Sequence, residues 1–253
     1  MPLVATEAIV LHSFDYLESS RILRLATREA GVQSVLAKGA RRSRSRFGSA
    51  LDLFAGGTAQ VSLRPGRDLQ TLVSFEVTRA RSGIAADLGR FTGAAAIAEL
   101  AIRFVDDDAQ PALFDSLRDT FDAIAAAEPG AAREVTLGAA WRLVAGLGFA
   151  PVLDVCGDCH AALAPEATVM FSHPAGGALC AACGRMASRG RLIPPAARSA
   201  LRDWLAGASP ALAGPDEARA HQRLLREFLR EHLADARAFV ALDVWERDEW
   251  SGA

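Results

Sequence analysis

The sequence is poor in two residue types that mark common functions. Lys38 is the only lysine among 28 Lys and Arg residues, and it lies in the context AKGA. A phosphate-binding P-loop needs Gly-Lys-Ser/Thr after a spaced glycine, so this context excludes motor chemistry of that class. Aromatic residues make up 7% of the chain, and Tyr16 is the only tyrosine. Stacking on rings is therefore expected to contribute less than charge to any nucleic-acid binding.

Long apolar runs and a secretory leader are also missing. No segment has 18 uninterrupted apolar residues, and MPLVATEAIV lacks the cationic start and small-residue cleavage site of a signal peptide. We expect no membrane association and a cytoplasmic location. Because thiols stay reduced there, the four cysteines are expected to be metal ligands or buried thiols rather than disulfides.

Charge is nearly balanced overall but uneven along the chain. The net charge of −2 gives no whole-molecule attraction to nucleic acid. No Asp or Glu lies between Glu29 and Asp52, and this acid-free segment contains KGARRSRSRFG. Five of the nine residues from Lys38 to Arg46 are cationic. A polyanion site would have to use this local excess.

The first 80 residues predict five short strands. They are rich in Val, Ile, Leu, Thr and Phe, with Gly31 and the PGRD turn at Pro65–Asp68 indicating hairpins. The expected strands cover residues 5–14, 20–29, 31–39, 56–63 and 69–80. The basic segment falls between the third and fourth strands. A five-stranded barrel of this size is typical of an OB-fold.

From about Ser82 the apolar period changes to three and four residues, which predicts packed helices. The expected helices cover residues 90–107, 111–128, 132–149, 196–207 and 216–239. The fold class is therefore α+β and multidomain. We expect an OB-fold domain at residues 1–80 and a mainly helical domain at 81–253, with a zinc-finger insertion at about 152–186. The C-terminal WERDEWSGA, with Trp245 and Trp250, is compatible with a packed end or a loose tail.

Two C-x2-C pairs, separated by 20 residues, predict a metal site. The ligands are Cys156, Cys159, Cys180 and Cys183. This spacing and an intervening hairpin that turns at PAGG favour one structural Zn²⁺ per chain, with no position left open for catalysis. Unmetallated thiols or a redox pair are the alternatives. His160 and His173 lie nearby and could replace a thiolate, but we expect them to be surface histidines.

The basic segment predicts contacts with nucleic-acid phosphates. Arginine pairs bidentately with phosphate, and a groove on a small barrel can follow a flexible strand. Phe47 could offer a ring to a base, and Arg64 and Arg67 either extend the positive surface or serve only the hairpin. A solvated loop is the alternative, since that is the usual state of a run of charge. The candidate contacts are Lys38, Arg41, Arg42, Arg44, Arg46, Arg64 and Arg67.

Three segments carry a family resemblance: EAIVLHSFDYLESSRILRLATREAG, KGARRSRSRFGSALDLFAGGTAQVSLRPGRDLQTL and GLGFAPVLDVCGDC. The strand leading to Tyr16, Glu18 and Ser19, the KGARR-x-x-SRF run and the four-cysteine spacing follow in that order. In these features the chain resembles the RecO family of bacterial DNA repair proteins. The resemblance covers most of the chain, and beyond about residue 190 it is only a general helical character.

The resemblance implies a recombination mediator of the RecF pathway, associated with the nucleoid. Such a protein binds single- and double-stranded DNA and anneals complementary strands. With RecR it loads RecA onto DNA coated with single-strand-binding protein, and it has no catalytic turnover. The family's dock for the C-terminal tail of single-strand-binding protein lies in the helical domain, where Arg142 is a candidate contact.

Two other functions stay open. One is a protein scaffold whose zinc and helical regions join repair partners, with only incidental DNA contact. The other is an enzyme that uses the cysteine cluster, but the sequence offers no convincing nucleophile, base and orienting group at interpretable spacing. We therefore expect no catalytic residues.

Overall fold

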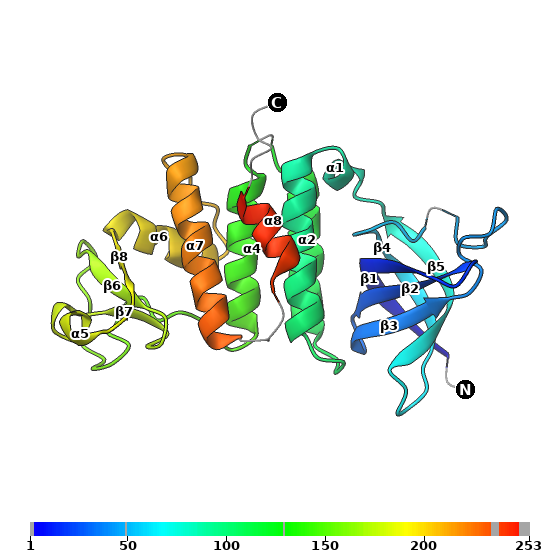
Figure 1. Cartoon of the computed structure of the whole chain (residues 1–253), viewed down its shortest axis with the longest axis horizontal. Helices are drawn as coiled ribbons and strands as arrows, with labels where there is room; N and C mark the ends of the chain where they lie inside the picture. The colour runs from blue at the N-terminus through cyan, green and yellow to red at the C-terminus, as the bar shows by residue number, and fades with distance from the viewer. Residues whose placement is uncertain (1–2, 49, 129, 234–237, 248–253) are drawn as a thin grey trace. The chain divides into compact units, whose positions relative to one another are not determined.

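The computed structural model describes residues 3–48, 50–128, 130–233 and 238–247. The chain divides into two compact units, Met1–Pro129 and Gly130–Ala253. In its described residues, the first unit contains a barrel and three helices. The second contains helices and a small sheet (Figure 1).

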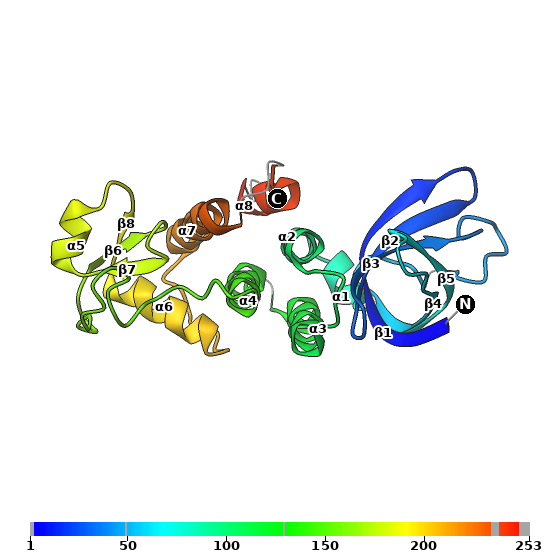
Figure 2. The ribbon, with the colours of Figure 1, turned by 90° about the horizontal axis from the view of Figure 1, so that it is seen from below.

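Five strands of the first unit close into a barrel. They are β1 (Leu3–Tyr16), β2 (Ser20–Thr27), β3 (Gly31–Ala37), β4 (Gly56–Ser62) and β5 (Leu69–Arg79). Their order around the barrel is β1-β2-β3-β5-β4, with β3 and β5 parallel and the other pairs antiparallel. Figure 2 shows these strands curling around a common interior. The predicted OB-type barrel is confirmed.

Alternating apolar side chains fill the interior of the barrel. Leu23 and Leu25 of β2, Val35 of β3 and Leu72 of β5 are fully buried in one cluster. The predicted turn residues behave as expected, because Gly31 and Gly66 both have positive φ. A side chain is strained in that conformation, whereas glycine adopts it freely.

A β-bulge in β1 reverses which side chains face the core. Val10 pairs with Leu25 and His12 pairs with Arg24, so Leu11 is an extra residue on β1. Before the bulge the even residues, such as Val10, lie in the barrel core. After it the even residues lie on the outer surface, since a one-residue shift moves a strand's side chains to the opposite face.

Three helices follow the barrel in the first unit: α1 (Ser82–Ala85), α2 (Leu88–Phe104) and α3 (Pro111–Ala126). Phe54, just before β4, contacts Phe91 of α2 and Phe121 of α3 with ring centroids 5.7 Å and 5.4 Å away. Arg81 adds an ion pair with Asp122, N to O 2.7 Å. These helices therefore share a compact unit with the barrel. The predicted domain boundary at residue 80 coincides with the end of β5 and stays a prediction.

Four helices of the second unit pack around buried aromatic rings: α4 (Ala132–Gly146), α6 (Pro195–Leu205), α7 (Pro215–His232) and α8 (Val240–Arg247). Trp141 of α4 contacts Phe228 of α7, with ring centroids 5.2 Å apart. Trp204 of α6 lies against Gly138, where a β-carbon would come within 2.7 Å of the indole. The absence of a side chain at Gly138 is thus what lets α6 approach α4.

A small module precedes α6 in the second unit. It contains β6 (Val169–Ser172), β7 (Gly177–Leu179), α5 (Ala181–Met186) and β8 (Arg191–Ile193), with the sheet order β7-β6-β8. The predicted hairpin is confirmed as β6 and β7. Arg198 of α6 donates to the carbonyls of Ala164 and Pro165, and Arg202 pairs with Asp154 at 2.6 Å. Two arginines therefore hold the module to α6.

Some expectations about the second unit need correction or lie outside the described residues. His173 is not a surface histidine, because it is buried and its Nε2 lies 3.0 Å from Glu227 of α7. His160 is exposed, as expected. Trp245 is buried, which favours a packed end, whereas Trp250 and residues 234–237 of the predicted last helix lie outside the described residues.

Candidate nucleic-acid interface and metal centre

The basic segment lies in the connector between β3 and β4, residues 38–55, as predicted. Phe47 and Leu51 insert into the core cluster of the barrel and anchor the connector. Successive turns shape its first part, with Arg42 N bonded to Gly39 O and Ser45 N to Arg42 O. Arg41 N also donates to Ser19 O, which ties the segment to the β1–β2 turn. The connector is therefore an attached surface feature rather than a loose loop.

The five cations of the connector point outward. All of them are exposed: Lys38, Arg41, Arg42, Arg44 and Arg46. Arg41 lies 3.4 Å from Asp15, and this is the one ion pair that the five make with the described residues. Arg46 lies over the Phe47 ring, 4.9 Å from its centroid. Charge on this surface is thus left largely uncompensated, which favours binding of a polyanion.

The proposed role of Phe47 as a stacking ring is wrong. Its side chain is only 3% exposed because it fills the barrel interior. An apolar ring next to a chain of charges gains more from burial in a core than from exposure at the surface. Phe47 therefore fixes the connector and does not meet a ligand.

Arg64 and Arg67 are exposed, but the barrel does not bring them next to the connector. Gln70 holds their turn, since its side chain donates to the carbonyls of both residues, at 3.1 Å and 2.6 Å. The parallel register pairs Leu69 with Ser34, so the turn lies toward the start of β3. The connector leaves from the other end of β3. These two arginines would form a positively charged site separate from the connector.

Sequence reasoning missed three rings on the outer face of β1. His12, Phe14 and Tyr16 are exposed and alternate along the strand. Phe14 is 50% exposed and Tyr16 39%. Alternation alone would have put all three in line with the buried Val10, and only the bulge at Leu11 turns them outward. A run of three aromatic residues at period two in the sequence was the available signal.

The four predicted ligands converge in the small module. Their sulfur atoms all lie within 4.8 Å of one another, and those of Cys159 and Cys180 are 3.8 Å apart. Four sulfurs at about 2.3 Å from a tetrahedral ion would be about 3.8 Å apart, so the thiols have the spacing of a metal site. The separation is too long for a disulfide. The cluster can hold a metal ion, whose ligands are Cys156, Cys159, Cys180 and Cys183.

The surroundings of Cys156 favour its thiolate form by lowering its pKa. Burial opposes ionisation of Cys156, but backbone N–H groups at Cys159, Cys180 and Asp158 outweigh it and lower the pKa of Cys156 to about 6. Hydrogen bonds with neighbouring thiols raise the pKa of Cys183 to about 12. All four groups cannot be ionised at neutral pH unless a cation offsets their mutual repulsion. The donor set therefore fits a thiolate-binding dication.

Comparison with known proteins identifies the family. The model described as "Recombination protein O N terminal" matches residues 1–81, and "Recombination protein O C terminal" matches residues 85–238. The chain belongs to the RecO family. A "DNA repair protein RecO" from Anaeromyxobacter sp. (strain Fw109-5) is 40% identical over 233 residues, covering 89% of each chain. The RecO of Rubrobacter xylanophilus is 33% identical over 235 residues, covering 92% of each chain.

As a RecO family member, the chain is a DNA repair protein. Within the part of the chain that the structure describes, no helix is long and apolar enough to cross a membrane. Arg142, the candidate contact for a partner's tail, is half-buried and donates to the carbonyl of Trp204 at 3.2 Å. That hydrogen bond gives Arg142 a role in helix packing.

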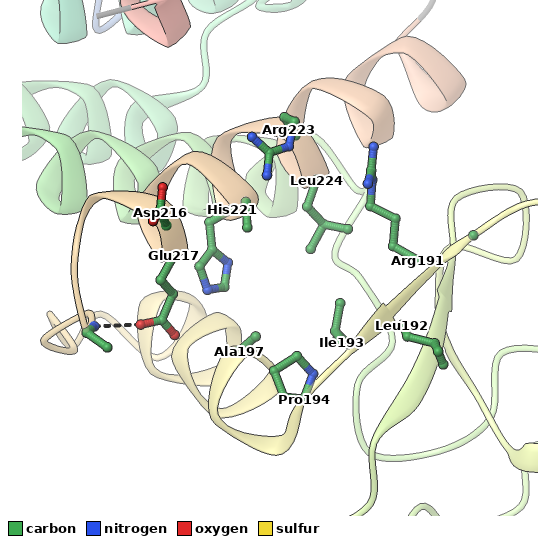
Figure 3. A pocket seen from close by; sticks show the side chains of 13 residues that line it. Arg191, Leu192, Ile193, Pro194, Ala197, Asp216, Glu217, His221, Arg223 and Leu224 are labelled. Carbon is green, nitrogen blue, oxygen red and sulfur yellow. Dashed lines mark hydrogen bonds between the residues drawn. The ribbon is translucent and has the colours of Figure 1, made fainter.

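The second unit also has an open cavity of about 700 Å³ between β8, α6 and α7. Its apolar lining includes Leu192, Ile193 and Leu224. Figure 3 shows the imidazole of His221 pointing into this space from α7. His221 is 2% exposed, and neither of its ring nitrogens has a hydrogen-bond partner among the residues that the structure describes. Its ring edge meets Trp204, with centroids 4.8 Å apart.

The buried His221 predicts a loss of stability in mild acid. Burial, opposed in part by Glu217, lowers the pKa of His221 to about 4, whereas an unfolded histidine has a pKa of about 6.5. The unfolded state then binds more protons between these values, so stability falls as the pH drops from about 6.5 toward 4. We expect the free energy of unfolding to fall by about 2 kcal/mol between pH 7.5 and pH 5 from this group alone.

Urea unfolding of the wild type and of His221→Phe at several pH values measures this effect. The difference between the unfolding free energies of the two proteins at each pH cancels the contributions of the other titrating groups, including the thiols. The exposed His160→Phe is the matched control and should follow the wild type. Parallel pH curves for His221→Phe and the wild type would contradict the assignment.

Gly177 allows the segment before the first C-x2-C pair to lie close to β7, which precedes the second pair. Its β-carbon would lie 2.1 Å from the carbonyl oxygen of Val152, so Gly177→Ala must displace the strand before Cys156. We expect a loss of about 1–3 kcal/mol in stability and weaker metal retention under competition with a chelator. Gly176→Ala is the control, because its β-carbon meets only His232 at 4.0 Å and its cost is the backbone strain at φ +69°. Equal metal retention in both variants would refute the steric argument.

Proposed function

We propose that this RecO family protein binds DNA through the connector surface of its barrel, without reading base sequence. The supporting observation is the anchored connector, whose five exposed cations make a single ion pair, between Arg41 and Asp15, with the described residues. Such groups contact phosphates, which are the same at every position of a strand. The candidate contacts are Lys38, Arg41, Arg42, Arg44 and Arg46, with Arg64 and Arg67 as a second, separate point.

Salt dependence tests this proposal directly. If four or five phosphates are neutralised, the logarithm of the association constant for single-stranded DNA should fall with the logarithm of salt concentration with a slope of about −3. Fluorescence anisotropy of labelled oligonucleotides of unrelated sequence, titrated between 50 and about 300 mM salt, measures that slope. A slope near zero, or affinities that differ strongly between sequences, would refute phosphate-based binding.

DNA binding of this type suits a recombination mediator. Two strands held close, with their charge neutralised, can pair faster, and annealing needs no fuel. We assign to this protein the annealing of complementary strands and, with RecR, the loading of RecA onto DNA coated with single-strand-binding protein. It would act on both single- and double-stranded DNA, without catalytic turnover. RecF is a further expected partner.

The ion in the cysteine cluster is proposed to be a structural Zn²⁺. Zinc accepts four thiolates in a tetrahedron, and a closed set of four protein ligands leaves no site for substrate. The thiol spacing supports this assignment. Elemental analysis of protein purified without added metal, expected to give one zinc per chain, is the measurement.

A second candidate role, joining repair partners, rests on the cavity in Figure 3. Leu192 is 70% exposed at its edge, and exposed apolar side chains beside an apolar hollow are typical of protein-binding sites. Capture of RecR and of single-strand-binding protein by the wild type and by Leu192→Asp separates this role from DNA binding. A protein that captures neither partner, yet still binds DNA, excludes the scaffold as the main function.

A further inference from the structure

The outer face of β1 carries an aromatic surface on the hairpin to which the basic connector is attached. After the bulge at Leu11, the side chains of His12, Phe14 and Tyr16 share one face of the strand. His12 and Phe14 stack with ring centroids 4.2 Å apart and planes 9° from parallel. Phe14 nevertheless stays 50% exposed and Tyr16 39%. Rings kept at the surface in this way forgo the stabilisation that burial would give them.

The same hairpin holds the start of the basic connector. Arg41 donates its backbone N–H to Ser19 O at 3.0 Å, and its guanidinium lies 3.4 Å from Asp15 of β1. Gly39 N also approaches Ser20 Oγ at 3.4 Å. The connector and the three rings therefore belong to the same hairpin of the first unit, with the rings on one face of β1 and Asp15, the partner of Arg41, on the other.

We propose that His12, Phe14 and Tyr16 form a stacking platform for unpaired bases, and that this platform selects single-stranded over double-stranded DNA. The inference rests on the proposed DNA-binding function and adds a preference for single strands, which phosphate contacts cannot provide. Cations hold a duplex and a single strand alike, because both present phosphates. Only a single strand can offer the flat face of a base to a ring, since paired bases are already stacked on one another.

The chemistry of the surface favours a nucleic acid over other occupants. Stacking on aromatic side chains tolerates any base, because every base has a π-face. Arg24 pairs with His12 in the strand register and so shares the face of the rings, and the connector cations are held at the other side of the same hairpin. These cations attract the phosphates that follow the stacked bases. An apolar protein segment would use the rings but would leave these cations unmatched.

The test compares Phe14→Ala/Tyr16→Ala with the wild type on three DNA molecules of equal length. On a single strand we expect the affinity to fall by about tenfold for each ring removed. On a duplex, and on a strand of abasic sites that keeps the phosphates, we expect no more than a small change. The salt slope should stay as in the wild type, since no cation is lost. Phe14→Tyr/Tyr16→Phe keeps both rings and should bind like the wild type.

The outcomes separate this inference from the proposed function. An equal loss on all three DNA molecules, or no loss on the single strand, overturns the platform. If the wild type binds no DNA at all, the proposed function itself fails. If the ring variant keeps its DNA affinity but loses capture of RecR, the surface is a protein interface and the platform is again overturned. Unchanged thermal unfolding of the variants confirms that they are folded.

Discussion

Glutamine in place of four connector arginines is expected to weaken DNA binding by several hundred-fold at about 0.1 M monovalent salt. The four positions are Arg41, Arg42, Arg44 and Arg46. Each phosphate contact to a single strand releases about 0.7 of a counterion, so four lost contacts remove nearly three orders of magnitude at that salt concentration. The salt slope should move from about −3 toward zero. Anisotropy titrations at several salt concentrations measure both quantities.

The fold should survive this change. Arg41 makes one surface ion pair, and the anchors Phe47 and Leu51 stay in place. Exposed pairs contribute at most about 1 kcal/mol to stability. A matched control removes the same charge from exposed arginines of the second unit, by glutamine at Arg185, Arg189, Arg219 and Arg230. An equal loss in the control would show that net charge, and not the connector, governs binding.

The strands of the barrel and the position of the connector were predictable from the sequence. Partial alternation and the turn residues Gly31 and Gly66 fixed five strands to within a few residues. The four thiols were predictable for a similar reason, since a C-x2-C pair forms its geometry locally. In each case the signal lies within a short segment of chain.

Features that depend on distant contacts were not predictable. The bulge at Leu11 is a property of how β1 pairs with β2, and it decides whether Phe14 lies inside or outside. Phe47 looked like a surface ring because its neighbours are charged, yet the barrel interior has room for it. His173 is buried among residues that include Phe228 and Glu227 of α7, the second of which lies 54 residues later in the chain. The spacing of residues in the sequence does not show which distant residues will come into contact.

Removal of the metal is expected to unfold the small module while the barrel stays folded. Structural zinc supplies on the order of 10 kcal/mol of folding free energy in small zinc-binding domains. The strands β6, β7 and β8 of the module are only three or four residues long, so the sheet by itself contributes little stability. Without a cation some of the thiols must take up protons, because four thiolates this close would repel one another.

Hydrogen exchange with and without a strong chelator, followed by mass spectrometry, resolves the two units. Amides of β6 and β7 should lose protection, whereas those of β2 and β3 should keep it. Cys159→Ser should act like the chelator, and His160→Ala, one residue away and exposed, should not. Intact protection in fully chelated protein would mean that apolar packing around Phe171 suffices to hold the module. Retention of DNA binding after chelation is also expected, because every proposed DNA contact lies in the first unit, where no cysteine is found.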